Sequence, residues 1–207
     1  MPIDNRATTT WTRAQEVYEH YQHYIESKQD KYALTFTDLV YVKNFKGGMT
    51  IISEPVATFS TKIGPYEKAL RALAEDECVL KSLGQLDDIE YARVRDAIVT
   101  FSGMTRPKQT PIEGFGVSFA SALLHFYFPD LVPILDRRAL NGSQIPGLNV
   151  DPRTKQVVNL FELYVSLIDY FRRRLRKETT LTLRLLDKEL FIQKLRAPPF
   201  GRKRDHD

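Results

Sequence analysis

Cysteine is almost missing from this chain: one residue of that type, Cys78, stands among 207. A single cysteine cannot form an internal disulfide, and it cannot build a cysteine-ligated zinc or iron–sulfur site. We therefore expect no iron–sulfur cluster and no cysteine-built metal site. No other metal and no other cofactor are expected. A chain without disulfides suits a reducing compartment, and the cytoplasm is the expected location.

Long apolar runs are missing too. No stretch reaches the roughly 18 consecutive apolar residues that a membrane-spanning helix needs, so we expect no membrane anchor. Residues 1–12 are polar and contain no apolar segment of the kind that a secretory signal carries. Hydrophobic residues nevertheless make up 43% of the chain, so a packed core is expected rather than wholesale disorder.

The net charge is small, +4, but it is unevenly distributed. Residues 171–207 hold 12 lysines and arginines against 5 aspartates and glutamates, a balance of +7, which leaves −3 for the other 170 residues. A positive C-terminal region favours an anionic partner, with nucleic acid first. A solvated helix face followed by a basic tail explains the same charge equally well. The candidate DNA contacts in this region are Arg172, Arg173 and Arg176.

Apolar and aromatic residues recur at helical spacing along nearly the whole chain, which predicts an all-α protein. The clearest apolar face lies in residues 155–176. The Met-Thr-Ile-Ile run at 49–52 looks like a strand, but no second such run is present to pair with it, so a helix is favoured there. The expected helices are 11–28, 38–45, 49–57, 65–74, 87–101, 117–128, 136–140, 155–176 and 183–195, with Thr10, Thr37 and Thr182 as N-caps.

Two glycines flank one apolar residue just before a predicted helix, in the run Ile112-Glu113-Gly114-Phe115-Gly116. Glycine permits positive φ and the close approach of another backbone. The helix that follows begins with N–H groups that have no intrahelical acceptor. Together these features predict a site for one nucleic-acid phosphate, formed by Gly114, Gly116, Val117 and Ser118. The alternative is a glycine-rich helix start that binds no ligand.

This segment resembles the hairpin of the helix-hairpin-helix family, which has the pattern apolar-x-Gly-apolar-Gly-x-x-x-Ala. Ile112, Gly114, Phe115, Gly116 and Ala120 match that pattern position for position. The hairpin occurs in glycosylases, polymerases, ligases and junction-binding proteins. The resemblance of the hairpin alone therefore implies binding to double-stranded DNA and no particular reaction.

The residues after the hairpin are similar to those of one branch of the family, the DNA base-excision glycosylases. In these enzymes a catalytic aspartate opens a helix at about the distance that separates Asp136 from Ser118. The run Pro133-Ile134-Leu135-Asp136 is similar to the stretch before that aspartate in adenine-removing members. The resemblance, specific over residues 112–140, implies a catalytic role for Asp136, which is compatible with a helix N-cap. Arg137 and Arg138 follow it as candidate DNA contacts.

The residue at position 118 bears on the type of reaction. Some members of the family carry a lysine there, which forms a Schiff base and permits strand cleavage. Ser118 cannot do so, and the resemblance therefore implies a monofunctional glycosylase that removes a damaged or mispaired base. It also implies one all-α domain over residues 1–200, with two lobes around a cleft. Residues 201–207 are expected to be a disordered basic tail. The proline-rich connector 104–111 departs from the family's short approach to the hairpin.

Two other functions remain open at this point. One is a DNA-binding protein of the same fold that has lost catalysis. The other is a helical ribonuclease of a defence or toxin system, because Arg13 and His20 have the spacing of a short Arg…His signature found in such enzymes. His20 and His23 are three residues apart, but no further zinc ligands stand out, so solvated histidines are the favoured interpretation.

Overall fold

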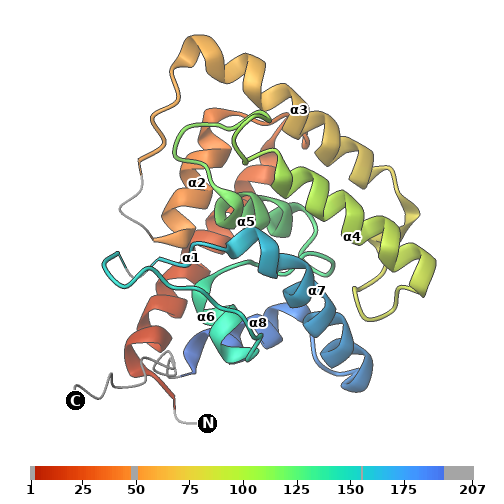
Figure 1. Cartoon of the computed structure of the whole chain (residues 1–207). Helices are drawn as coiled ribbons and strands as arrows, with labels where there is room; N and C mark the ends of the chain where they lie inside the picture. Colours follow the sequence, from red (N-terminus) through yellow and green to blue (C-terminus); the bar gives the residue numbers. More distant parts are fainter. Residues whose placement is uncertain (1–2, 48–50, 155, 194–207) are drawn as a thin grey trace.

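The computed structural model describes residues 3–47, 51–154 and 156–193, and all regular structure in this part of the chain is helical (Figure 1). The all-α prediction is therefore confirmed. The β-bridges of these residues are isolated pairs rather than strands. The elements in chain order are α1 (Asn5–Ser27), α2 (Phe36–Lys46), α3 (Val56–Ala74), the 3-10 helix η1 (Glu77–Leu80), α4 (Asp88–Gly103), α5 (Val117–Tyr127), α6 (Arg137–Gly142), α7 (Leu160–Lys177) and α8 (Leu183–Ile192).

Local side-chain chemistry explains where most helices begin and end. Asp4 caps α1 by accepting backbone N–H groups of its first turn. Asp87 and Glu90 form a capping box at the start of α4. Thr182 caps α8, as predicted. Gly47 ends α2 in the left-handed conformation, with φ of 60°, close to the end predicted for the helix 38–45.

Several predicted boundaries are wrong. Helix α1 begins at Asn5 rather than after Thr10, because Asp4 supplies the cap. Helix α2 begins after Thr35 rather than Thr37. Helix α7 begins at Leu160, because the residues before it form a turn in which the N–H of Asp151 donates to the carbonyl of Gln156 at 2.8 Å. The 3-10 helix η1 was not predicted at all.

The region between α2 and α4 differs most from the prediction. Residues 51–55 are not helical, because their backbone bonds to the hairpin: the N–H of Ser53 donates to the carbonyl of Glu113 at 3.2 Å. Helix α3 runs unbroken through Pro65, which was expected to begin a helix. A proline there removes one helical hydrogen bond. The buried side chains on both sides of it keep one apolar face continuous, and they are Phe59, Ile63, Tyr66, Leu70 and Leu73.

Helix α5 lies at the centre of the molecule (Figure 1). It packs against α1, α2, α4 and α7, and residues 120–127 are all buried. This burial matches the small-residue, apolar character of the segment, which has no polar face to present to water. Its first residues, in contrast, are half-buried and border a cleft.

The two ends of the described chain lie side by side. The N–H of Asp4 donates to the carbonyl of Ile192 at 2.8 Å, and α8 packs against α1 and α6. Arg184 of α8 fixes this arrangement: its guanidinium lies 3.9 Å from the ring centroid of Trp11 and donates to Asp187 at 2.9 Å. The remainder of the predicted last helix, Pro198-Pro199 and the predicted tail 201–207 lie outside the described residues.

Candidate functional site

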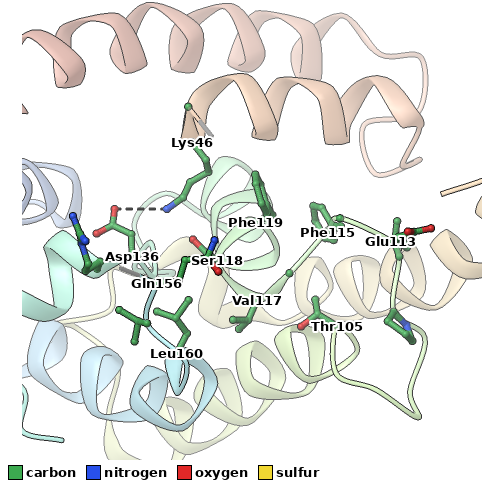
Figure 2. Close-up of a pocket in the computed structure, with 17 residues that line it drawn as sticks. Lys46, Thr105, Glu113, Phe115, Val117, Ser118, Phe119, Asp136, Gln156 and Leu160 are labelled. Carbon is green, nitrogen blue, oxygen red and sulfur yellow. Dashed lines mark ion pairs between the residues drawn. The ribbon is translucent and has the colours of Figure 1, made fainter. Parts of the chain in front are cut away.

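A cleft of about 860 Å³ brings together the end of α2, the hairpin, the start of α5 and the start of α6 (Figure 2). Its wall contains Gly114, Gly116, Val117 and Ser118, which were predicted to bind phosphate, and also Asp136 and Arg137. The structure therefore gathers most of the predicted site on one surface. It adds residues from distant segments, namely Lys46, Gly47, Thr105, Gln156, Val157 and Leu160.

The hairpin turn depends on glycine at Gly114. The N–H of Phe115 donates to the carbonyl of Ile112 at 3.0 Å, and Gly114 has φ of +81° between them. A Cβ on Gly114 would lie 2.0 Å from the carbonyl oxygen of Ile51. The close backbone approach expected here is therefore made by the protein's own segment 51–52. Phe115 is 2% exposed and anchors the turn in the core.

The buried carboxylate of Glu54 stabilises the hairpin turn through a hydrogen bond from the N–H of Glu113. Glu54 accepts hydrogen bonds from Lys62 (2.8 Å), from the hydroxyl of Thr58 and from the N–H of Glu113 (2.8 Å). The hydrogen bond from Lys62, followed by those from Thr58 and Glu113, lowers the pKa of Glu54 to about 2. Sequence reasoning missed Glu54, since nothing in residues 51–55 indicated that they pair with the hairpin.

Gly116 has a different role from Gly114. It is the N-cap of α5 with φ of −87°, a conformation open to any residue, and a Cβ there would meet nothing within 4 Å. No side chain of the described residues caps α5. The start of α5 therefore lies beside the cleft without a side-chain cap, and the helix dipole favours an anion there.

Asp136 borders the same cleft as this helix start, and the residue before it, Leu135, accepts a hydrogen bond from Ser118 in the first turn of α5. It caps α6, as predicted: its Oδ1 accepts the N–H of Ala139 at 2.7 Å. Its other oxygen, Oδ2, is 3.6 Å from the ammonium of Lys46, as Figure 2 shows. The side chains of Asp136 and Lys46 are 19% and 11% exposed. The pair is therefore mostly buried but can still be reached from the cleft. Lys46 also donates to the carbonyl of Leu135 at 3.3 Å.

One face of α5 fixes the segment that leads into Asp136. Ser118 donates to the carbonyl of Leu135 at 2.7 Å, and Ser121 accepts the N–H of the same residue at 2.9 Å. One turn further on, Nδ1 of His125 donates to the carbonyl of Val132 at 2.7 Å. Burial lowers the pKa of His125 to about 3, so the ring is neutral and structural. These contacts make the position of Asp136 a direct consequence of the position of α5.

We expect Ser121→Ala to lower the free energy of unfolding by about 1–3 kcal/mol, because it leaves the buried N–H of Leu135 without an acceptor. Urea denaturation of the two proteins measures the difference. Ser27→Ala is the matched control, since Ser27 is exposed and bonds only within its own helix. Equal losses in the two variants would contradict this account of how the segment is held.

The predicted arginines separate into two groups. Arg137 is exposed and borders the cleft. Arg138 instead pairs with Asp4 at 3.0 Å and donates to the carbonyl of Phe191. Arg172 and Arg176 lie on α7 away from the cleft, and both donate to the carbonyl of Leu86 at 2.9 Å. Arg173 is exposed on the same helix, away from the cleft.

The residues on which the ribonuclease and zinc interpretations depend do not line the cleft. Arg13, His20 and His23 are exposed on α1. Within the described ranges, no group of three or more His, Cys, Asp or Glu side chains is arranged to hold a metal ion. None of the helices in the described part of the chain combines the length and the apolarity that a bilayer crossing requires.

Comparisons with known proteins leave the site to be interpreted from its own geometry. No protein-family model matches the chain, no curated protein is similar to it, and no solved structure matches it.

Proposed function

We propose that this protein binds double-stranded DNA through the hairpin and the start of α5, and that it removes a damaged or mispaired base by hydrolysis of the N-glycosidic bond. The observation that carries the proposal is a carboxylate, Asp136, in the same cleft as the uncapped start of α5. A phosphate at that helix start places the neighbouring sugar within the cleft. The two-lobed glycosylase fold and the monofunctional reaction belong to this proposal.

In the proposed reaction the bond between C1′ of the sugar and the base nitrogen breaks, and the base leaves with the electron pair. Positive charge develops on the sugar, and the carboxylate of Asp136 stabilises it. Water then adds to C1′, Asp136 accepts a proton from that water, and the proton passes to the departed base or to solvent. The N–H of Ala139 holds Oδ1, so Oδ2 is the oxygen available for these steps.

Lys46 is the feature that most affects this mechanism. In the free protein its ammonium neutralises Oδ2 of Asp136. A cationic sugar would compete with that ammonium, and a phosphate in the cleft would attract it. The pair also supports the runner-up function, a DNA-binding protein without catalysis, because a carboxylate that stays paired with lysine is not free to act.

The binding step predicts a strong dependence on salt. Neutralised phosphates release counterions, so affinity for duplex DNA should fall linearly on logarithmic axes as salt rises, by roughly tenfold or more across the physiological range. Gel-shift titrations at several salt concentrations measure the slope. An affinity for duplex DNA that does not change with salt concentration, or no binding to any duplex at low salt, would contradict the proposal.

A further inference from the structure

A second, smaller cavity adjoins the cleft at the Lys46–Asp136 ion pair. Its volume is about 40 Å³, and it is bordered by α1, α2, α8 and the segment that leads into Asp136. Lys46 and Asp136 line both cavities, whereas Asp187 lines the smaller one, the inner chamber, and not the cleft. Two carboxylates and one ammonium group therefore meet where the cleft and the inner chamber join.

The contact between Lys46 and Asp136 is a loose one. Its N···O separation of 3.6 Å exceeds the roughly 2.7–3.2 Å of an N–H···O hydrogen bond, so charge attraction alone holds the two groups together. Lys46 also donates to the carbonyl of Leu135 at 3.3 Å, but that carbonyl accepts a shorter hydrogen bond, of 2.7 Å, from Ser118. When the ammonium group moves away, the carbonyl of Leu135 keeps a donor, and Asp136 still borders the cleft and its water.

Asp187 has a carboxylate oxygen that lacks a donor. The residue is 2% exposed, and its Oδ2 accepts from Arg184 at 2.9 Å. Its Oδ1 is buried and has no hydrogen-bond partner among the described residues. A buried carboxylate oxygen without a donor costs free energy, and an ammonium group that donates to it recovers that cost. Asp187 is therefore a second acceptor for the charge that Lys46 carries.

The inner chamber has room for the ammonium group. A volume of about 40 Å³ holds one or two groups the size of a water molecule, and an ammonium group is of that size. Lysine carries its charge on a flexible stem, so side-chain rotation moves the group without a change in the backbone. The rings of Trp11, Phe45 and Phe191 also border the chamber. These apolar walls lower the local dielectric constant, which strengthens attraction between charges inside the chamber.

We propose that Asp187 is a positioning residue that controls the charge of Asp136 through Lys46. In one state the ammonium group pairs with Oδ2 of Asp136, and in the other state it enters the inner chamber and donates to Oδ1 of Asp187. The second state leaves Asp136 without a counter-ion at the cleft, as the proposed reaction requires. The exchange of partners is a property of the free protein, and its effect on base release rests on the proposed function.

The ionisation of Asp187 determines which state prevails. The charged and titratable groups that face it are Arg184 of its own helix, Tyr18 of α1, Lys46 of α2 and Asp136. Burial, helped by Asp136, raises the pKa of Asp187 to about 7 against the opposing effects of Arg184 and Lys46. Below this pH the neutral carboxyl attracts the ammonium group weakly, and above it the carboxylate competes for it. Base release should therefore increase as the pH rises through about 7.

The exchange is measured in the free protein by NMR of the lysine side chains, with the signal of Lys46 assigned by its loss in Lys46→Met. We expect the ammonium nitrogen of Lys46 to shift with a midpoint near pH 7, because the group changes its partner as Asp187 ionises. The nuclear Overhauser contact between Lys46 and the ring of Trp11, the single tryptophan, should strengthen at the same time. Trp11 reports position because it lines the inner chamber and not the cleft.

Two variants of α8 separate this role from a general effect of charge. Asp187→Asn keeps an amide oxygen for Arg184 but cannot ionise, so both the shift and the stronger contact of Lys46 with Trp11 should disappear. Glu189→Gln removes a carboxylate that is 46% exposed and lies outside the inner chamber, and it should keep both signals.

Rates of base release test the effect on the reaction. The ratio of the wild-type to the Asp187→Asn single-turnover rate should rise by roughly tenfold between about pH 6 and about pH 8, because the variant stays in the paired state. A ratio on one substrate cancels the effect of pH on the leaving base. In a Lys46→Met background, Asp187→Asn should cause no further pH-dependent change, since the group through which it acts is gone.

Titration of Lys46 near pH 7 and its absence from Asp187→Asn support the inference. No titration in the wild type, the same titration in Asp187→Asn, or parallel pH–rate profiles of the two proteins overturns it. The proposed function fails separately, by the absence of duplex binding or of base release. The NMR titration still decides in that case whether Lys46 changes its partner, so the two failures are distinguishable.

Discussion

Asp136→Asn should reduce base release by roughly 10²–10⁴-fold while DNA binding stays unchanged or becomes tighter. The substitution keeps the shape of the side chain and its acceptor for the N–H of Ala139, but it removes the negative charge that stabilises the sugar cation. Binding improves or holds because a negative charge near the phosphates is gone. Single-turnover assays measure the rate on duplexes that carry deaminated, oxidised or alkylated bases, with alkali to reveal abasic sites.

The same assays include a control variant and define the results that would contradict the role assigned to Asp136. Asp130→Asn removes an equal charge from an exposed position outside the cleft and should leave the rate unchanged. An Asp136→Asn variant as fast as the wild type would show that the assigned role is wrong. A wild type that binds DNA well but releases no base from a broad panel would make the non-catalytic function the better one.

The product of the reaction gives a second test of the same site. Ser118 donates to the carbonyl of Leu135 and carries no amine, so borohydride should trap no covalent adduct through it. Lys46 is the amine beside Asp136, and it is held in an ion pair. If an adduct formed, its loss in Lys46→Met would identify that lysine as the nucleophile and would contradict the monofunctional assignment.

Gly116→Leu should weaken binding to all duplex sequences alike, by about tenfold or more, without lowering the stability of the fold. A Cβ at Gly116 meets nothing within 4 Å, and its φ of −87° suits any residue, so the leucine is accommodated. Its side chain then covers the helix start where the phosphate is proposed to bind. Phosphate contacts position the protein without reading bases, so sequence preference should not change. Fluorescence anisotropy on several duplexes measures this loss.

Gly114→Ala is the informative counterpart, because it damages the fold and not only the surface. The added Cβ would lie 2.0 Å from the carbonyl oxygen of Ile51, at a φ that side chains rarely adopt. Thermal denaturation should therefore show a large loss of stability in Gly114→Ala and little change in Gly116→Leu. Undiminished DNA binding by a folded Gly116→Leu protein would exclude the start of α5 as the phosphate site.

The sequence contained enough to predict those features that depend on neighbouring residues. Gly47 ends a helix, Thr182 begins one and Asp136 caps α6, and each depends on the few residues beside it. The close backbone approach expected at the glycine pair exists at Gly114. The partner in that approach, Ile51, was expected to be helical, because a short apolar run does not by itself distinguish helix, strand and loop.

The missed residues are those whose partners are distant in the chain. Lys46 lies just beyond the predicted helix 38–45 and had no predicted role, and its partner Asp136 is 90 residues further along the chain. Glu54 meets the hairpin only because segment 51–54 folds back onto it. Asp187 lies on α8, for which a solvated charged face was one of two interpretations, yet it is 2% exposed on a helix that packs against α1, α6 and α7. A single sequence carries no signal for such long-range pairings.

The adjacency of the two ends of the described chain also affects how the protein is made. A ribosome completes α1 before α8, yet α8 packs on both α1 and α6. Helices α4 and α5 emerge earlier and contact each other without α8. At about 5–20 residues per second, several seconds separate the synthesis of α6 from that of α8. During that interval the nascent chain holds the hairpin but lacks the helix on which α6, and with it Asp136, is supported.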